Sequence, residues 1–312
     1  MSSSIQNNAS GVVPPVVDLH LHTTASDGQL SPTELIEQVA GTSLRVVAVT
    51  DHDSTEGINE ARKATARHPH LTLIAGIELG TEDGESDVHL ISHFVDPSAP
   101  GLQDFLSHLR DGRIEAAEAT VIRLGELGIH ISWERVMEIA GGAVGRPHIA
   151  RAMAEAGYVK SAQDAFQRYL GNDGLARVKR PKPTPGDGVR FLHSIGATAT
   201  LAHPQTVKGL RRILGFLVDE GLDGIEVFAP KYGTSDRERR IEVAKRSGLI
   251  PVGGSDYHAW ETSEEIVPGD AKTVGPPMDA VDKLRAAADR WKAAVTRAPQ
   301  IPGAGCPTPN SG

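Results

Sequence analysis

The chain has 312 residues, a formal net charge of −8 and a hydrophobic fraction of 39%. This length suits one large domain or one domain with an insertion, and the acidic balance argues against a broad basic surface for duplex DNA. The single cysteine, Cys306, excludes a disulfide framework and argues against a zinc–thiolate site.

Neither a signal peptide nor a membrane span is expected. The start of the chain lacks a basic segment followed by an apolar one, and no run of about 18 apolar residues occurs. We therefore expect a cytoplasmic protein, and nothing in the sequence indicates an obligate protein partner. The composition of residues 1–15 and about 297–312 predicts disordered tails.

Seven short apolar or β-branched runs predict the strands of a sheet. Their Val, Ile, Ala and Leu content is typical of strands that are buried on both faces of a parallel sheet. The predicted strands are 16–22, 45–50, 72–78, 87–94, 197–202, 223–228 and 249–255.

Helical segments lie between most of these strands, and the first one is well marked. We expect Ser31 to cap it, Pro32 to take its first position, Glu34 to complete a capping box and Gly41 to end it. Alternation of strands and helices predicts an α/β architecture with right-handed crossovers. Further helices are predicted at 56–67, 205–220, 234–247 and 278–295.

Residues 99–190 interrupt this alternation, because they contain helical segments and no clear strand. We interpret them as a helical insertion that covers the substrate. Their end, ARVKRPKPTPG, is basic and rich in proline, which suits an extended linker. The helices predicted within the insertion are 101–127, 132–140, 147–156 and 161–170.

Acidic and imidazole side chains stand near the ends of the predicted strands, where α/β proteins often carry functional groups. Alternate residues of a strand share a face, so His20 and His22 form a chelating pair with Asp18 beside them as a partner for an imidazole. The candidate metal ligands are His20, His22, Asp27, His52, Glu78, His89, His203, Asp256 and His258.

Some of these ligands have plain structural alternatives. Asp27 is also a typical turn residue, and Glu78 also suits an exposed strand end. Asp256 and His258 follow a strand at a spacing that places both on one face, after two glycines that let the backbone approach a site closely.

Two strand ends offer a choice of ligand. We favour His52, because its neighbours Asp51 and Asp53 can cap the next helix instead, with Asp51 also expected to support the site. On the fourth strand either His89 or His93 can face the site. We favour His89 as the ligand and His93 as a supporting residue.

Five motifs in this order, DLHLHTTASDG, TDHDS, GIEL, AHP and GSDYH, resemble those of the PHP (polymerase and histidinol phosphatase) family. The resemblance covers about 16–98 and 191–260 and implies a distorted (β/α)7 barrel built from segments 16–98 and 191–296. It also implies three divalent metal ions, for which nitrogen and oxygen ligands suit Mn²⁺ first, with Fe²⁺ or Zn²⁺ as alternatives.

The resemblance also divides the ligands among the ions. A surplus of positive charge would attract a phosphate dianion, and a metal-bound hydroxide held by Glu78, His89 and His203 would attack phosphorus. By position, the first ion would bind His20, His22, Glu78 and Asp256, the second Glu78, His89 and His203, and the third Asp27, His52 and His258.

The insertion resembles the branch of the family that acts on nucleoside 3′,5′-bisphosphates and on the 5′ ends of short RNA, through phrases such as LRDGRIEAAE and VGRPHIARAMAEAGYV. That resemblance implies that Arg113 and Arg146 grip a second phosphate, that His148 supports the Arg146 loop, and that Arg180 or Lys182 adds a contact. The alternatives are a solvated helix face for Arg113, a capping or packing role for His148, and a solvated basic linker.

We therefore expect a metal-dependent phosphatase that removes the 3′-phosphate of nucleoside 3′,5′-bisphosphates and also trims short 5′-phosphorylated RNA. The alternative within the same chemistry is a phosphatase or cyclic phosphodiesterase for another small phosphoester, such as a sugar phosphate or histidinol phosphate. A non-catalytic metal-binding regulatory protein is the alternative from another class, and the complete ligand set argues against it.

Overall fold

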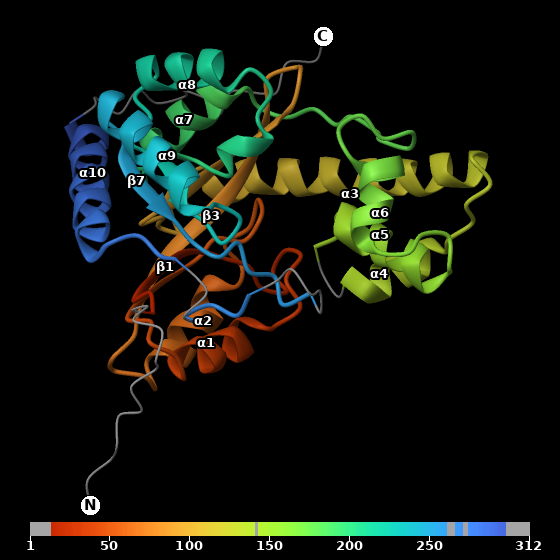
Figure 1. The fold of residues 1–312 in the computed structure, drawn as a ribbon, viewed down its shortest axis with the longest axis horizontal. Helices are drawn as coiled ribbons and strands as arrows, with labels where there is room; N and C mark the ends of the chain where they lie inside the picture. Colours follow the sequence, from red (N-terminus) through yellow and green to blue (C-terminus); the bar gives the residue numbers. More distant parts are fainter. Residues whose placement is uncertain (1–13, 141–142, 261–265, 271–273, 298–312) are drawn as a thin grey trace, which may run out of the picture.

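The computed structural model describes residues 14–140, 143–260, 266–270 and 274–297 (Figure 1). Nearly all of the two tails for which disorder is expected, 1–15 and about 297–312, lies outside the described residues. None of the helices in the described part of the chain has both the length and the apolar character needed to cross a membrane.

A curled seven-stranded sheet forms the centre of the larger part of the molecule. The His22 N–H donates to the Tyr257 carbonyl at 3.0 Å and the Asp256 N–H to the His20 carbonyl at 3.0 Å, so the first strand meets the segment after the last one. These bonds close the sheet at its mouth and confirm the predicted distorted α/β barrel. In spatial order the strands are β1 (Val17–Leu21), β2 (Val46–Val49), β3 (Thr72–Glu82), β4 (Asp87–His93), β5 (Thr200–Leu201), β6 (Gly224–Phe228) and β7 (Ile250–Gly253).

The expectation of a parallel sheet is wrong at β4, which pairs antiparallel with both β3 and β5. Residues 83–86 alone join β3 to β4, and a connection this short permits a hairpin but no crossover helix. In this register His89 pairs with Gly80 and His93 with Gly76. The beginning of β4, rather than its end, therefore lies at the mouth where the parallel strands end.

The helices around the barrel follow the predictions, except for a helix at Pro185–Ser194 that was not predicted. The Ser31 side chain accepts from the Glu34 N–H at 3.2 Å, and the Glu34 carboxylate accepts from the Ser31 N–H at 2.8 Å, which confirms the capping box. The predicted helix 205–220 divides into a 3-10 turn, Pro204–Thr206, and a separate helix. The barrel helices are α1 (Pro32–Ala40), α2 (Ile58–Thr65), α7 (Pro185–Ser194), α8 (Leu210–Asp219), α9 (Thr234–Arg246) and α10 (Met278–Arg297).

The insertion forms a second lobe to the right of the barrel in Figure 1. It has its own apolar core, which includes Leu124, Val136, Ile149 and Met153. Its elements are α3 (Leu102–Glu126), α4 (Trp133–Ala140), α5 (Arg146–Glu155), α6 (Ala162–Ala165) and the π-helical turn η1 (Phe166–Leu170).

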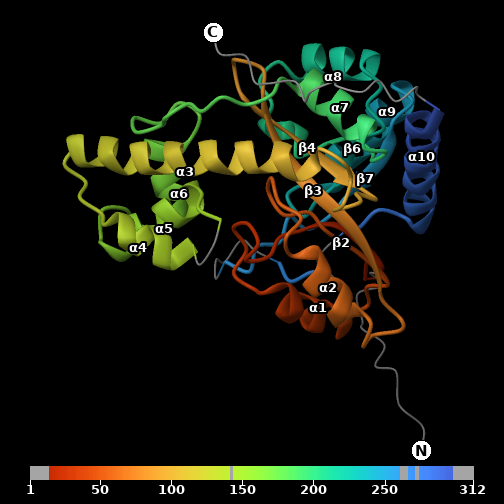
Figure 2. The same ribbon diagram turned by 180° about the vertical axis from the view of Figure 1, so that it is seen from behind.

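The long helix α3 belongs to both lobes, as the view from behind in Figure 2 shows. Leu106 near its start packs into the barrel core, and Leu124 near its end packs into the insertion core. The chain returns through a linker to α7, whose Val189 and Leu192 also pack into the barrel core. The expected end of the insertion at residue 190 falls inside this helix.

Truncation of a buried side chain near the start of α3 should destabilise the protein. Leu106 is 0% exposed, so Leu106→Ala should lower the free energy of unfolding by about 2–5 kcal/mol, through lost burial and a cavity. Ile122 on the same helix is 62% exposed, and Ile122→Ala should change the free energy of unfolding by less than about 0.5 kcal/mol. Urea denaturation measures both, and similar losses would contradict this account of α3.

Candidate metal centre

The predicted ligands meet at the mouth of the barrel. They lie at the ends of β1 and β2, on β3 and near the start of β4, and in the segments that follow β5 and β7. Within each of three overlapping groups, one donor atom from every residue lies within 4.8 Å of the others. The groups are His20, His22, Glu78 and Asp256; His22, Asp27, His52 and His258; and His52, Glu78 and His89.

Glu78 lies at the centre of this cluster and is fully buried. Its Oε2 is 3.0 Å from His20 Nε2 and 3.2 Å from His22 Nε2. Its Oε1 is 2.7 Å from His89 Nδ1 and 2.8 Å from His203 Nε2. Burial alone would raise the pKa of Glu78, but the surrounding imidazoles hold it well below its usual range. His52 Nδ1 also lies 3.4 Å from Glu78 Oε2. A carboxylate whose two oxygens face separate sets of imidazoles would suit a position between two cations.

Asp256 approaches the same imidazoles from the segment after β7. Its Oδ1 lies 3.4 Å from His20 Nε2 and 3.5 Å from His22 Nε2. The residue has a φ of 57°, a left-handed conformation that is uncommon outside glycine and that recurs at functional sites. These donors form the set that was expected for a first ion.

Asp27 is the centre of the group beside it. Its carboxylate lies 3.7 Å from His52 Nε2 and 3.4 Å from His258 Nε2, with His22 Nδ1 at 3.8 Å. Burial lowers the pKa of His258, yet Asp27 outweighs it and raises that pKa to about 10. The His258 ring therefore carries a proton beside Asp27, and a bound divalent cation would displace that proton.

Buried donor atoms without hydrogen-bond partners support a metal site here. Among the described residues, both ring nitrogens of His22, Asp27 Oδ1 and His52 Nδ1 are buried and have no hydrogen-bond partner. Native proteins rarely leave such atoms unsatisfied unless an ion or water completes them. The nitrogen and oxygen donors, without thiolate, suit Mn²⁺, Fe²⁺ or Zn²⁺.

Two of the three predicted supporting residues accept hydrogen bonds from backbone N–H groups. Asp18 Oδ1 accepts from the N–H groups of His20 at 3.2 Å and Ser255 at 3.0 Å, so it ties β1 to the segment after β7. Asp51 accepts from the Thr23 N–H at 2.7 Å and from the Ser26 hydroxyl at 2.6 Å, which fixes the loop that carries Asp27. The expectation that Asp18 meets an imidazole is corrected by these contacts.

His93 lies deeper in the barrel than His89, because β4 runs down from the mouth. Its Nε2 donates to the Leu19 carbonyl at 3.0 Å, and burial lowers its pKa to about 4. It belongs to none of the three donor groups in the described residues. The direction of β4 therefore explains why His89 and not His93 joins the cluster.

Glu226 on β6 is a functional residue that the sequence reasoning missed. It is 1% exposed, and its Oε1 accepts from His20 Nδ1 at 2.9 Å while its Oε2 accepts from the His203 N–H at 2.6 Å. Metal-binding histidines commonly donate their second ring N–H to such an acceptor, which fixes the tautomer and the orientation of the ring. A carboxylate inside the apolar strand DGIEVF was the available signal.

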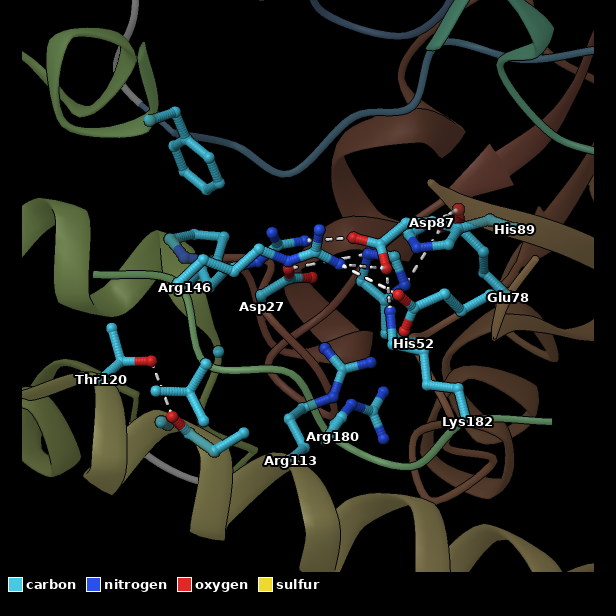
Figure 3. Close-up of a pocket in the computed structure, with 18 of the residues that line it drawn as sticks. Asp27, His52, Glu78, Asp87, His89, Arg113, Thr120, Arg146, Arg180 and Lys182 are labelled. Carbon is cyan, nitrogen blue, oxygen red and sulfur yellow. Dashed lines mark hydrogen bonds and ion pairs between the residues drawn. The ribbon is translucent and has the colours of Figure 1, made fainter. Parts of the chain in front are cut away.

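Cationic side chains from the insertion and the linker line a cavity of about 270 Å³ beside the cluster (Figure 3). Asp53 accepts from the guanidinium groups of Arg113 at 2.6 Å and Arg180 at 2.9 Å. It is thus a clamp for two cations and not a helix cap, since α2 begins after Gly57 without a side-chain cap. The cations that line the cavity are Arg113, Arg146, Arg177, Lys179, Arg180 and Lys182.

Asp87, at the start of β4, is a second clamp that the sequence reasoning missed. It accepts from Arg146 at 3.0 Å and Arg177 at 3.2 Å, and from Lys182. Burial would raise the pKa of Asp87, but these cations hold it well below its usual range. The alternative of a solvated linker is wrong for Arg180 and Lys182, whose side chains are each 9% exposed.

His148 caps a helix. Its Nδ1 accepts from the Gly145 N–H at 3.0 Å at the start of α5, and its buried ring lies 5.7 Å from that of Trp260. This bond supports the segment that carries Arg146. The ring is not among the described residues that line the cavity, so direct contact with a substrate stays a prediction without structural support.

Comparison with known proteins agrees with this geometry. Residues 18–171 match the PHP domain. The chain is 32% identical over 249 residues to a 5′-3′ exoribonuclease Rnm of Salmonella typhimurium, a match that spans 78% of this chain and 85% of that protein. The chain belongs to the PHP family.

Other relatives of this PHP protein differ in the substrate that their names give. A 3′,5′-nucleoside bisphosphate phosphatase of Chromobacterium violaceum is 32% identical, over 78% of this chain and 87% of its own. A phosphoribosyl 1,2-cyclic phosphate 1,2-diphosphodiesterase of Eggerthella lenta is also 32% identical, over 78% of this chain and 94% of its own. A sulfate-bound, metal-free amidohydrolase structure from C. violaceum superposes with a TM-score of 0.79 at 30% identity, covering 88% of this chain and 97% of that one.

The relatives and the donor cluster together establish the class of chemistry. This PHP protein is a hydrolase that acts on phosphoric esters with the aid of divalent metal. The fold and the family expected from the sequence are both confirmed.

Removal of Glu226 should weaken metal binding before it affects the fold. Glu226→Ala removes the acceptor for His20 Nδ1, so the affinity for Mn²⁺ should fall by about 10–100-fold, and Glu226→Gln, which keeps an acceptor oxygen, should lose less. Equilibrium dialysis with elemental analysis measures the bound metal. Glu242→Ala, an exposed change on α9, is the matched control, and an unchanged affinity in Glu226→Ala would refute the positioning role.

Proposed function

We propose that this protein removes the 3′-phosphate of nucleoside 3′,5′-bisphosphates and also trims short 5′-phosphorylated RNA. The observation that carries the proposal is that two regions line one cavity, one that would attract an anion once divalent ions are bound and one that carries cations. The metal-donor cluster lies at one side, and the clamped cations lie beside it. A substrate with a single phosphate needs only the first region, whereas a bisphosphate occupies both.

The cation set is suited to a second phosphate because the carboxylates of Asp53 and Asp87 do not cancel its positive charge. Asp53 and Asp87 hold Arg113, Arg146, Arg177, Arg180 and Lys182 in place, so cations outnumber carboxylates. Each guanidinium has five N–H donors, and those not used by a clamp can reach a phosphate. The clamps also fix the side chains before substrate arrives, which lowers the entropy lost on binding.

The two proposed activities share one chemical unit. A nucleoside 3′,5′-bisphosphate and the first nucleotide of a 5′-phosphorylated RNA both carry a 5′-phosphate and a phosphoryl group on the 3′ oxygen. With the 5′-phosphate on the cation set, the 3′ phosphoryl group lies at the donor cluster in both cases. Hydrolysis there releases inorganic phosphate from the first substrate and a nucleoside 5′-monophosphate from the second.

The proposed metal site would hold three divalent ions, with Mn²⁺ the first candidate, in the sets His20–His22–Glu78–Asp256, Glu78–His89–His203 and Asp27–His52–His258. Such ions acidify bound water and neutralise charge on the phosphoryl oxygens. The chain itself contributes the geometry. Glu226 orients His20, and Glu78 would supply an oxygen to neighbouring sites. Arg113 and Arg146 would hold the part of the substrate that does not react.

A cyclic sugar phosphate is the second candidate substrate. The E. lenta relative is named for a phosphoribosyl 1,2-cyclic phosphate, which also carries two phosphoryl groups on one ribose. The same two regions of the cavity would accommodate it, so a direct comparison of substrates must separate the two.

Rates with a panel of substrates test the proposal. Phosphate release by Mn²⁺-loaded protein should be fastest from adenosine 3′,5′-bisphosphate, compared with histidinol phosphate and a phosphoribosyl 1,2-cyclic phosphate followed by product analysis. Preference for either of the latter would reject the leading substrate. Arg113→Ala should raise KM for the bisphosphate by about 10-fold or more through loss of a charge-assisted bond, whereas Arg123→Ala on the same helix, where Arg123 is exposed, should not.

The pH dependence of KM tests Lys182. Burial lowers the pKa of Lys182 to about 8, although Asp87 opposes the shift. The cation is present below that pKa and is lost as pH rises through it, so KM for the bisphosphate should rise by about 10-fold between roughly pH 7 and 9. Lys182→Arg stays charged throughout and should remove this rise. An equal rise in the variant would show that another group titrates.

A further inference from the structure

The cavity has an apolar wall that the two phosphates leave unused. Ala116, Ala117 and Thr120 contribute to it from α3, Phe166 from η1 and Val178 from the linker. Figure 3 shows Thr120 and Glu78 on opposite sides of the cavity, with Arg113 and Arg180 between them. The lining therefore changes from metal donors through cations to apolar groups.

Phe166 is the one Phe, Tyr or Trp side chain among the described residues of this lining. Its side chain packs against the insertion core, which supports the ring. Its carbonyl accepts from the Gly171 N–H at 2.8 Å across a π-helical turn, an element that is frequent at functional sites. The guanidinium carbon of Arg146 lies 5.8 Å from the ring centroid. The ring is thus a supported flat surface next to a proposed phosphate-binding cation.

We propose that Phe166 is the stacking platform for the nucleobase of the substrate. The inference rests on the proposed function and extends it to the third group of the substrate. Once the phosphates on the 3′ and 5′ oxygens are held, the base on C1′ is the remaining part of the nucleotide that needs a surface. Phe166 adjoins Arg146, so a 5′-phosphate on the cation set brings the base within reach of the ring.

The same wall predicts weak discrimination among bases. Asn and Gln side chains, which read base edges well, do not occur among the described residues that line the cavity. The Thr120 hydroxyl donates to the Ala116 carbonyl at 2.7 Å, and Asp87 and Glu82 face cations of the linker. Stacking tolerates every base because each has a π face. Adenosine, guanosine, cytidine and uridine 3′,5′-bisphosphates should therefore differ in kcat/KM by no more than about tenfold.

Equilibrium binding measurements separate the contribution of the base to affinity from that of the phosphate. Calorimetry with Mn²⁺-loaded protein should show that Phe166→Ala weakens binding of adenosine 5′-monophosphate by about 10-fold and that of ribose 5-phosphate, which lacks the base, by less than about twofold. Phe166→Tyr keeps a ring and should retain the affinity for adenosine 5′-monophosphate. Leu175→Ala, a change at a side chain that is 63% exposed, is the control within the insertion.

Each of the following outcomes would contradict the stacking role of Phe166. Equal weakening of both ligands in Phe166→Ala would show that the ring only supports the Arg146 region, and no weakening of either would show that it is not used. Equal affinity of the unaltered protein for the two ligands would show that no base subsite exists. Failure of the proposed function is seen separately, as absence of hydrolysis of the 3′,5′-bisphosphate by unaltered protein that still binds adenosine 5′-monophosphate more tightly than ribose 5-phosphate.

Discussion

A buried carboxylate must be matched by positive charge, and most of this site follows from that requirement. Glu78 is fully buried at the mouth of the barrel, where both of its oxygens face imidazole nitrogens. Imidazoles alone match such a charge only when they are protonated, whereas divalent cations match it and leave the rings neutral. The sheet brings these groups together because its strand ends converge at the mouth and the His22 and Tyr257 segments close it there.

The same requirement joins the insertion to the barrel. Asp53 and Asp87 are barrel residues with little exposure, and the cations that match them come from α3, α5 and the linker. Loss of all the cations around Asp53 or Asp87 would leave a buried carboxylate unpaired, so ion pairs as well as the shared helix α3 hold the insertion against the barrel. A cavity with a surplus of cations is the consequence, since the cations exceed the carboxylates that position them.

The sequence allowed the cluster to be predicted because strand ends in an α/β fold share one edge, so ligands at those ends converge without any knowledge of distances. The direction of β4 was missed because apolar composition carries no direction, although the short 83–86 connection did contain that information. A capping role stayed open for Asp53, because a carboxylate after a strand suits either a helix cap or a site. Glu226 and Asp87 were missed because their partners, His20 and the linker cations, are distant in sequence.

Asp53 and Asp87 also show how the barrel positions the cations of the proposed second phosphate site. Asp53 directly follows the metal donor His52, and Asp87 precedes the donor His89 by two residues on the same face of β4. Each clamp is therefore tied to a metal donor by a stretch of backbone that the sheet holds in place. The insertion supplies the cations, but the barrel sets their distance from the donor cluster. Substitutions elsewhere in the insertion could then alter the apolar wall proposed for the base without altering the spacing between the two proposed phosphate sites.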